Sequence, residues 1–276
     1  MAPRQLPFTK MHGAGNDFVV VDCRERDGGD WEELAPRLAH RRFGVGCDQV
    51  LLLRTSRSAD FAMDIYNADG SRVEMCGNGI RCLARYLREK GISDAESFRV
   101  ETLAGVVVPR FRGDRVEVDM GEPEFEGRRI PVDADGPVRE FPVPLGEGAA
   151  KVTCLALGNP HAVVFVDDAV SYPVAEVGPR LETHPFFPNR VNVEFVQVLS
   201  ESELRMRVWE RGTGVTLACG TGASAAAVAA HWTGRTGREV AVHLDGGVLD
   251  IRWDADTAHV FMTGEAATVF EGEFYL

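Results

Sequence analysis

Two cysteines, Cys76 and Cys219, stand at the start of Cys-Gly-x-Gly turns that open onto helix-like runs, "CGNGIRCLARYL" and "CGTGASAAAVAA". A glycine-rich turn at a helix N-terminus presents backbone N–H groups and the positive end of the helix dipole, so it binds a carboxylate without basic side chains. The same dipole favours a thiolate by about one pKa unit, starting from about 8.5. We therefore expect each turn to combine an anion site with a thiol that exchanges protons near neutral pH.

The presence of two such turns indicates a reaction that takes place on two faces of one substrate atom. Inverting a stereocentre by proton transfer needs a base on one side and an acid on the other, and a thiolate and a thiol supply both. The helix N–H groups would hold the α-carboxylate and stabilise the charge that develops on it, where losing one such donor typically costs about 2.7–4 kcal/mol. The two turns thus predict an enzyme that inverts the α-carbon of an amino acid.

An internal repeat extends beyond the two turns. Only four of eighteen residues are identical between segments 63–80 and 206–223, so the argument rests on spacing. A constant offset of 143 positions separates four pairs, namely Asn16 and Asn159, Gln49 and Asn192, Asn67 and Glu210, and Cys76 and Cys219. This period is too long for a solenoid. It predicts two homologous domains that face one another.

Strand-like runs outnumber helix-like runs, which predicts a β-rich α+β fold. The expected helices are 30–40, 80–91 and 223–234, the last two ending at the C-cap candidates Gly91 and Gly234. The expected strands are 18–22, 49–53, 106–111, 115–120, 162–168, 191–199, 204–209, 239–244 and 248–254. Segment 121–150, rich in Pro, Gly and acidic residues, is expected to begin at a domain junction and to supply edge strands.

The composition of the 276 residues limits the possible partners. With 45% hydrophobic and 26% charged residues the chain is that of an ordinary globular protein, and its net charge of −12 argues against nucleic acid. No run is long and apolar enough to span a membrane, and the start lacks the features of a signal peptide, so we expect a cytoplasmic protein with reduced cysteines. The cysteine spacings match no metal motif, and we expect no metal site.

Other readings of the cysteines remain open at this stage. Cys23, Cys47, Cys82 and Cys154 are interpreted as packing residues. A covalent cysteine nucleophile with His12, His161 or His184 as its base would explain one turn and leave the second unexplained. A duplicated, non-catalytic module that binds amino acids would not require cysteine at both turns.

Six motifs together resemble those of the diaminopimelate epimerases: "MHGAGNDFVV", "GVGCDQ", "YNADGSRVEMCGNGIRC", "GNPHAVVF", "VNVEF" and "WERGTGVTLACGTG". They run in order from residue 11 to residue 222. The resemblance implies an enzyme without pyridoxal phosphate or metal that interconverts LL- and meso-diaminopimelate in lysine and peptidoglycan-precursor biosynthesis. It also implies a homodimer. A proline or hydroxyproline racemase is the alternative, because those enzymes share the Cys-Gly-x-Gly element.

The resemblance also implies the fold and the domain limits. Two pseudo-symmetric domains are expected, each a curved, mostly antiparallel sheet wrapped around a central helix, with the C-terminal strand returning to the first domain. The first would comprise residues 1–120 and 266–276 and contain Cys76. The second would comprise residues 121–265 and contain Cys219.

By the same resemblance Cys76 and Cys219 are the acid–base pair, and His161 and Glu210 assist proton movement. Arg211 is expected to bind the distal carboxylate of the substrate, and Glu210 an ammonium group. The remaining expected substrate-binding residues are Asn16, Gln49, Asn67, Gly77, Asn78, Asn159, Asn192, Gly220 and Thr221. Two positions depart from the family pattern: Val215 replaces a commonly acidic residue, and Cys47 a small one.

Overall fold

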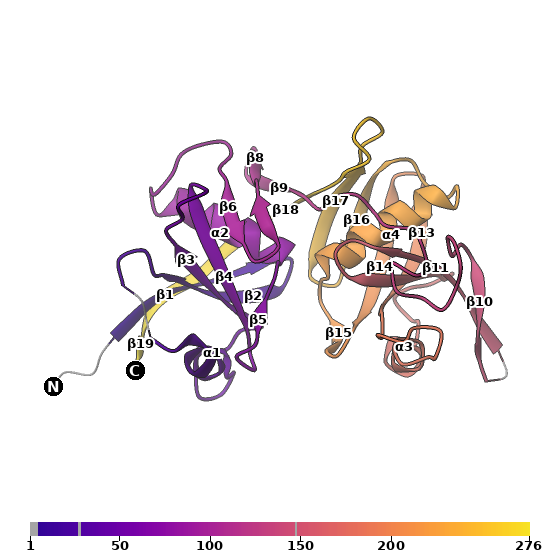
Figure 1. The fold of residues 1–276 in the computed structure, drawn as a ribbon, viewed down its shortest axis with the longest axis horizontal. Coiled ribbons are helices and arrows are strands. Elements are labelled where there is room, and N and C mark those ends of the chain that lie inside the picture. The colour runs from indigo at the N-terminus through magenta and orange to yellow at the C-terminus, as the bar shows by residue number, and fades with distance from the viewer. Residues whose placement is uncertain (1–4, 27–28, 147) are drawn as a thin grey trace. The chain divides into compact units, whose positions relative to one another are not determined.

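The computed structural model describes residues 5–26, 29–146 and 148–276, and the chain forms two units (Figure 1). The first comprises Met1–Val118 and Gly264–Leu276, and the second Asp119–Thr263. Residues 1–4, 27–28 and 147, which fall inside the expected domain ranges, lie outside the described residues. The ranges 1–120 with 266–276 and 121–265 stay a prediction about the functional halves.

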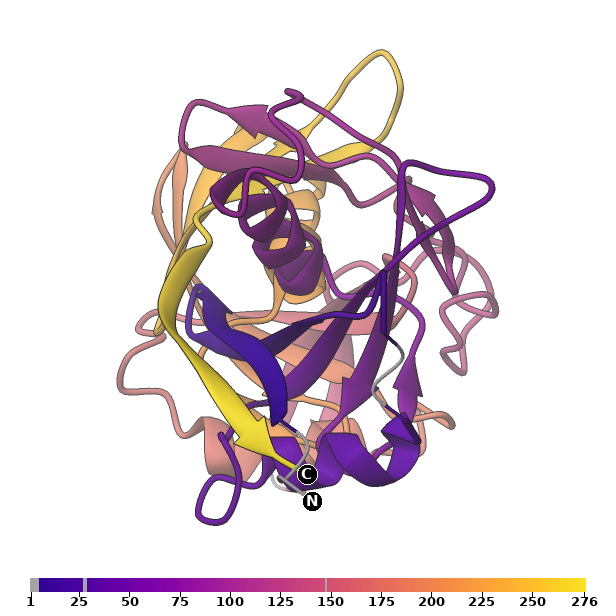
Figure 2. The same ribbon diagram turned by 90° about the vertical axis from the view of Figure 1, so that its left-hand side faces the viewer.

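The first unit is built on one sheet with strand order β19-β1-β2-β3-β4-β6-β7, in which β5 pairs with β4. Helix α2 packs against β1, β2, β3 and β19, whereas α1 packs against β3 and β4. The C-terminal strand β19 lies antiparallel beside β1 (Figure 2), and its return to the first unit is what the family resemblance implies. The elements are β1 (Gln5–Gly13), β2 (Asn16–Asp22), α1 (Trp31–Ala39), β3 (Gln49–Arg54), β4 (Phe61–Asn67), β5 (Arg72–Val73), α2 (Gly77–Glu89), β6 (Val100–Thr102), β7 (Gly105–Val107) and β19 (Ala267–Tyr275), with β8 (Arg110–Arg112) and β9 (Arg115–Asp119) forming a hairpin.

The second unit repeats this plan with strand order β10-β11-β12-β13-β14-β16-β17-β18, in which β15 pairs with β14. Helix α4 packs against β11 to β14 and against β16 and β17, and α3 packs against β13 to β15. The elements are β10 (Phe141–Leu145), β11 (Gly148–Ala156), β12 (Pro160–Phe165), α3 (Val174–Glu182), β13 (Asn192–Ser200), β14 (Glu203–Glu210), β15 (Gly214–Thr216), α4 (Gly220–Trp232), β16 (Glu239–Leu244), β17 (Gly247–Trp253) and β18 (Val260–Gly264).

The internal repeat is visible in the element bounds. Adding 143 to both bounds of β1, α1 and α2 gives the bounds of β11, α3 and α4. Strand pairing repeats too. In the first unit β2 and β3 are parallel and β3 and β4 are antiparallel. In the second unit β12 and β13 are parallel and β13 and β14 are antiparallel. The fold is therefore α+β, with two pseudo-symmetric domains, each a mostly antiparallel sheet around a central helix.

The central helices are buried because of their composition. Helix α4 is rich in alanine and apolar on all sides, and residues 222–230 are all buried. Helix α2 buries Arg81 in its first turns together with Ile80 and Leu83. Small residues let the backbone of each helix approach its sheet closely.

The two central helices begin earlier than predicted. They start at Gly77 and Gly220 rather than at residues 80 and 223, because the glycines of each turn already have helical geometry. They also end two residues earlier than predicted, α2 at residue 89 and α4 at residue 232. Gly91 and Gly234 follow their C-caps with φ of +63° and +76°, which confirms them as end signals.

Other differences from the sequence-based expectation involve proline and glycine. The expected strand 106–111 is two strands, β7 and β8, separated at Pro109. Helix α3 was not predicted, because Gly178 and Pro179 interrupt its pattern. A Cβ at Gly178 would lie 2.6 Å from that of Trp209, so glycine permits close packing of α3 on β14. Strands β1, β4, β5, β6, β11, β15 and β18 were not predicted, whereas β10 is an edge strand within 121–150, as expected.

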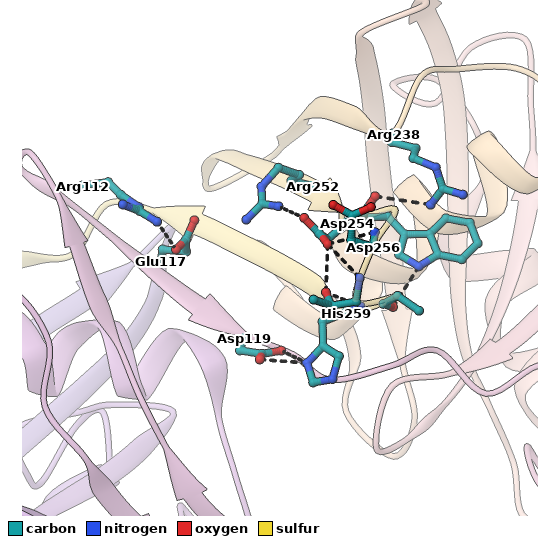
Figure 3. A network of polar contacts seen from close by, with 11 residues as sticks. Arg112, Glu117, Asp119, Arg238, Arg252, Asp254, Asp256 and His259 are labelled. Atoms are coloured by element: carbon teal, nitrogen blue, oxygen red, sulfur yellow. Dashed lines mark hydrogen bonds and ion pairs between the residues drawn. The ribbon is translucent and has the colours of Figure 1, made fainter.

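The chain enters and leaves the second unit side by side. The Met120 amide donates to the Val260 carbonyl over 2.8 Å, and the Val260 amide donates to the Gly121 carbonyl over 2.9 Å. His259 Nδ1 lies 2.8 Å from Asp119 Oδ2 at the same place (Figure 3). These contacts join the first residues of the unit to its last strand.

Candidate active site

The candidate residues of the first unit lie at one edge of its sheet. Asn16 begins β2, Gln49 begins β3, and Asn67 ends β4. Because β2 runs parallel to β3 and β4 antiparallel to it, these three positions are at the same end of their strands. Cys76 is the N-cap of α2, with extended backbone geometry (φ −140°, ψ 112°).

Asn16 connects the cysteine turn to the sheet edge. Its Oδ1 accepts a hydrogen bond from Asn78 Nδ2 at 3.1 Å and lies 3.8 Å from Cys76 Sγ. Its Nδ2 donates to Asp48 Oδ2 at 2.8 Å. Both ends of the Asn16 amide are therefore engaged, and its orientation is defined. Asp48 is absent from the residues predicted from the sequence.

Two buried amide oxygens in the first unit can accept hydrogen bonds from a ligand. Gln49 Nε2 donates to Asn67 Oδ1 at 2.9 Å, and Asn67 Nδ2 donates to Ser71 Oγ at 3.0 Å. Among the described residues, Gln49 Oε1 and Asn78 Oδ1 have no hydrogen-bond partner. A buried acceptor left unsatisfied costs about 1–3 kcal/mol, so a ligand with N–H donors would stabilise this edge.

The carboxylate of Asp17, the residue after Asn16, is held at the same edge by two basic side chains. Arg41 donates to it through Nη1 and Nη2 at 3.0 and 2.8 Å, and Lys10 donates through Nζ. Burial raises the pKa of Asp17, but the hydrogen bonds from Arg41 and Lys10 outweigh burial and lower this pKa to about 2. The carboxylate thus stabilises the fold above its unfolded-state pKa, and this contribution is lost as the pH falls toward 2.

Replacing Asp17 with asparagine is expected to destabilise the protein in a pH-dependent way. At pH 7 we expect the free energy of unfolding to fall by about 1–3 kcal/mol, because hydrogen bonds to a charged group are lost. The difference from the parent protein should shrink between pH 4 and pH 2, where the parent carboxylate becomes protonated. Urea unfolding at pH 7, 4 and 2.5 measures this. Asp22→Asn, which removes a more exposed carboxylate paired with Arg24, is the control and should have a smaller effect. A pH-independent difference for Asp17→Asn would contradict the explanation.

The second unit places its candidate residues at the corresponding edge. Asn159 directly precedes β12, Asn192 begins β13, and Glu210 ends β14. His161 is paired with Asn192 in the parallel register of β12 and β13. Cys219 is the N-cap of α4 (φ −123°, ψ 113°). The two units thus present their asparagines and their cysteine in the same arrangement.

Asn192 fixes the turn that carries Arg211. Its Nδ2 donates to the Pro160 carbonyl and its Oδ1 accepts from the Arg211 amide, both at 2.9 Å. The Arg211 side chain is exposed, with Nη1 3.4 Å from the Asn189 carbonyl. Glu210 accepts a hydrogen bond from the Thr216 hydroxyl. The turn therefore carries a carboxylate and a guanidinium on consecutive residues.

His161 is held between two acceptors in the interior. Its Nδ1 lies 2.7 Å from Glu194 Oε1, and its Nε2 lies 2.8 Å from Asn159 Oδ1. The side chains of His161 and Glu194 are both fully buried. Glu194 is also absent from the residues predicted from the sequence. The available signal was a lone carboxylate within the apolar strand "VNVEFVQV".

The environment of Cys219 contradicts the expected low thiol pKa. Its Sγ accepts from the Gly222 amide at 3.3 Å and lies 3.5 Å from Thr221 Oγ1. Burial raises the pKa of Cys219 well above its usual range, and the carboxylates of Glu210 and Glu194 raise it further. The hydrogen bonds from Thr221 and Gly222 act in the opposite direction without compensating. Desolvation outweighs these hydrogen bonds, so the surroundings of Cys219 favour the protonated thiol.

The electrostatic environment of Cys76 differs from that of Cys219. It is partly exposed, whereas Cys219 is buried. Arg81 in α2 is fully buried, which lowers its pKa to about 10, while the thiols of Cys82 and Cys76 act to raise it. The equivalent of Arg81 in the second unit, 143 positions later, is Ser224, which donates to the Gly220 carbonyl. A buried cation therefore influences Cys76, whereas two carboxylates influence Cys219.

The other cysteines, Cys23, Cys47, Cys82 and Cys154, are all buried, which fits the predicted packing role. Burial raises the pKa of Cys47 to about 12. Val215 is exposed on β15. In the described parts of the chain, no group of three or more His, Cys, Asp or Glu side chains could hold a metal ion. The helices described are all too short or too polar to cross a membrane.

Comparison with known proteins identifies the family. The sequence model of the family described as diaminopimelate epimerase matches residues 8–126 and 153–269. A protein of Moorella thermoacetica named diaminopimelate epimerase is 52% identical over 278 residues, covering 98% of this chain and 100% of the relative. The chain belongs to the diaminopimelate epimerase family. A second family member, from Heliobacterium modesticaldum, is 49% identical and covers the same shares.

More distant solved structures share the fold of this diaminopimelate epimerase family member. A PhzF-family phenazine biosynthesis protein of Bacillus anthracis superposes with a TM-score of 0.73 at 17% identity, over 99% of this chain and 100% of that one. A hydroxyproline epimerase of Agrobacterium vitis with bound trans-4-hydroxy-L-proline superposes with a TM-score of 0.71 at 20% identity, over 99% and 93%. At these identities the likeness concerns the fold alone.

Proposed function

We propose that the protein interconverts LL- and meso-diaminopimelate by proton transfer at the α-carbon. One of the two cysteines, Cys76 or Cys219, removes a proton, and the other supplies one from the opposite side. The protein's membership of the diaminopimelate epimerase family, at 52% identity over nearly the full length, is the observation that carries this proposal. In this role the protein serves lysine and peptidoglycan-precursor biosynthesis. Residues 1–120 with 266–276 would form the half with Cys76, and residues 121–265 the half with Cys219.

The two cysteines take complementary roles in the proposed reaction. One thiolate removes the α-proton, and the thiol on the opposite side delivers a proton, so the stereocentre inverts. The high pKa of Cys219 supports its role as the proton donor in the resting enzyme. The α-carboxylate binds to the helix N-termini, where Gly77 and Asn78, and Gly220 and Thr221, provide N–H groups.

The remaining polar residues recognise the second charged end of the substrate. The exposed guanidinium of Arg211 binds the distal carboxylate, and Glu210 beside it accepts from an ammonium group. Asn16, Gln49, Asn67, Asn159 and Asn192 complete the binding site, with the buried Gln49 Oε1 as an acceptor for a substrate N–H group. His161 assists proton movement through its place beside Asn159.

Three further properties belong to the same proposal. The enzyme works without an organic cofactor or a metal, because the two thiols and the helix N–H groups supply the required acid, base and charge stabilisation. It acts as a homodimer in the cytoplasm. A proline or hydroxyproline racemase is not favoured, because a substrate without a second charged end would leave Arg211 and Glu210 without partners.

A deuterium assay tests the proposed function. The purified protein is incubated in D₂O with LL-diaminopimelate, without added cofactor and with a chelator present, and followed by proton NMR and chiral chromatography. We expect meso-diaminopimelate that carries deuterium at the inverted carbon from its first appearance. L-Proline and trans-4-hydroxy-L-proline are tested in parallel and should not react. Turnover of either of them in place of diaminopimelate would reject the proposal.

A further inference from the structure

The buried pair of His161 and Glu194 breaks the symmetry of the internal repeat. Subtracting 143 places Phe18 at the position of His161 and Leu51 at the position of Glu194, and both of these side chains are fully buried apolar residues. The second unit thus buries a carboxylate and an imidazole where the first unit has ordinary core side chains. Burying such groups is costly unless they are paired, so packing alone does not explain them.

The pair forms the inner end of a hydrogen-bonded chain that reaches the edge of the sheet. Glu194 Oε1 lies 2.7 Å from His161 Nδ1, and His161 Nε2 lies 2.8 Å from Asn159 Oδ1. Both neighbours of the ring are acceptors, a carboxylate oxygen at Nδ1 and an amide carbonyl oxygen at Nε2, so the ring donates from both nitrogens. By accepting from Nδ1, Glu194 fixes the ring in the orientation in which Nε2 donates to Asn159.

The chain determines which end of the Asn159 amide is presented to a ligand. Since Oδ1 of Asn159 accepts from His161, its Nδ2 group is left to act as a donor. The equivalent residue Asn16 is held differently, because its Nδ2 donates to Asp48 and its Oδ1 accepts from Asn78. The two asparagines of the repeat are therefore oriented by different partners, although their types and positions are the same.

Glu194 is also built into the start of α4. A Cβ at Gly222 would lie 2.8 Å from Glu194 Oε1 and 3.2 Å from Cys219 Sγ. A Cβ added at the equivalent Gly79 would lie 3.2 Å from the Leu51 side chain. Among the described residues, Glu194 Oε2 has no hydrogen-bond partner. The carboxylate is therefore confined between the helix and His161, and its geometry is set by both.

We propose that Glu194 is a positioning residue that acts through His161 to orient Asn159, so that the Asn159 amide nitrogen donates to a carboxylate group of the substrate. This proposal rests on the proposed function, in which Asn159 binds substrate. Its distinguishing feature is that Glu194 acts at a distance, through one intervening ring, on a residue that it does not contact.

Two substitutions separate orientation from charge. In Glu194→Gln the amide can donate to His161 Nδ1, so that Nε2 still donates to Asn159, and we expect kcat/KM within about threefold of the parent. In Glu194→Leu, which introduces the residue found at position 51, the hold on the ring is lost. We expect kcat/KM to fall about 10–100-fold, mostly through KM, because a binding contact is misdirected. Equal losses in both variants, or a loss confined to kcat, would overturn the proposal.

A double-mutant cycle tests the coupling between Glu194 and Asn159. If Glu194 acts through Asn159, then Glu194→Leu should have little further effect on kcat/KM in an Asn159→Ala background. Additive losses would show that Glu194 acts independently of Asn159 and would overturn the proposal. Thermal unfolding of each variant shows that the comparison is made between folded proteins.

Nitrogen-15 NMR of the His161 ring gives a readout that does not depend on turnover. The signals are assigned by their absence in His161→Gln. We expect Nε2 to carry a proton in the parent and in Glu194→Gln, and the two nitrogens to share it in Glu194→Leu. Glu182→Leu is the control: it removes another buried carboxylate, one that binds Trp209 and Gly212, and should leave the His161 signals unchanged. Unchanged signals in Glu194→Leu would overturn the proposal whether or not the parent epimerises diaminopimelate.

Discussion

Replacing either Cys76 or Cys219 with alanine is expected to lower the rate of epimerisation by at least about 10³-fold. General acid or base catalysis by one group contributes about 10²–10⁴-fold, and inversion requires both groups in every turnover. Without the thiol on one side, the carbanion-like intermediate has no acid on that side. The proton can then return only to the face from which it left.

This reasoning makes a sharper prediction about hydrogen exchange. Each single variant retains one thiol, so it should still exchange the α-proton with solvent in the isomer that faces this thiol, without inverting it. Proton NMR in D₂O, starting from the LL and from the meso isomer, should show exchange of opposite isomers in the two variants. Cys23→Ala, which removes a buried core cysteine, is the control and should retain activity. Full epimerase activity in either active-site variant would rule out the two-thiol mechanism.

Adding a methyl group at Gly222 is expected to lower kcat/KM by about 100-fold, because a displacement near 1 Å at a reacting group can have an effect of this size. The new Cβ would lie 2.8 Å from Glu194 Oε1 and 3.2 Å from Cys219 Sγ. Either the carboxylate or the thiol has to move. Since both are buried, neither can move without disturbing its neighbours.

Gly79→Ala in the first unit provides the matched control. At this equivalent position the added Cβ would meet the Leu51 side chain at 3.2 Å and Cys76 Cβ at 3.4 Å. The flexible end of a leucine can move by a few tenths of an ångström, so we expect a loss of less than about tenfold. Steady-state kinetics and thermal unfolding of both variants measure the difference. A larger loss for Gly79→Ala than for Gly222→Ala would contradict the assigned environment of Cys219.

The placement of the candidate residues on strand ends and helix caps was predictable from the sequence, because it depends on local spacing. A cysteine directly before a glycine-rich turn becomes a helix N-cap in both units. Polar residues that flank apolar strands lie at strand ends, so Asn16, Gln49 and Asn67 share one edge. The 143-residue repeat also contains the signal for α3. Shifting the expected helix 30–40 by 143 positions gives 173–183, where α3 lies despite its internal glycine and proline.

Tertiary structure alone decided the surroundings of each candidate cysteine. Glu194 and His161 are 33 positions apart and come together only because β12 and β13 are neighbours in the sheet. The raised pKa of Cys219 depends on burial and on carboxylates brought in from other strands. A repeated sequence motif specifies a repeated backbone, since backbone geometry is largely local. Proton affinity depends instead on solvent exclusion and on charges from distant parts of the chain, and for this reason two like turns hold two unlike cysteines.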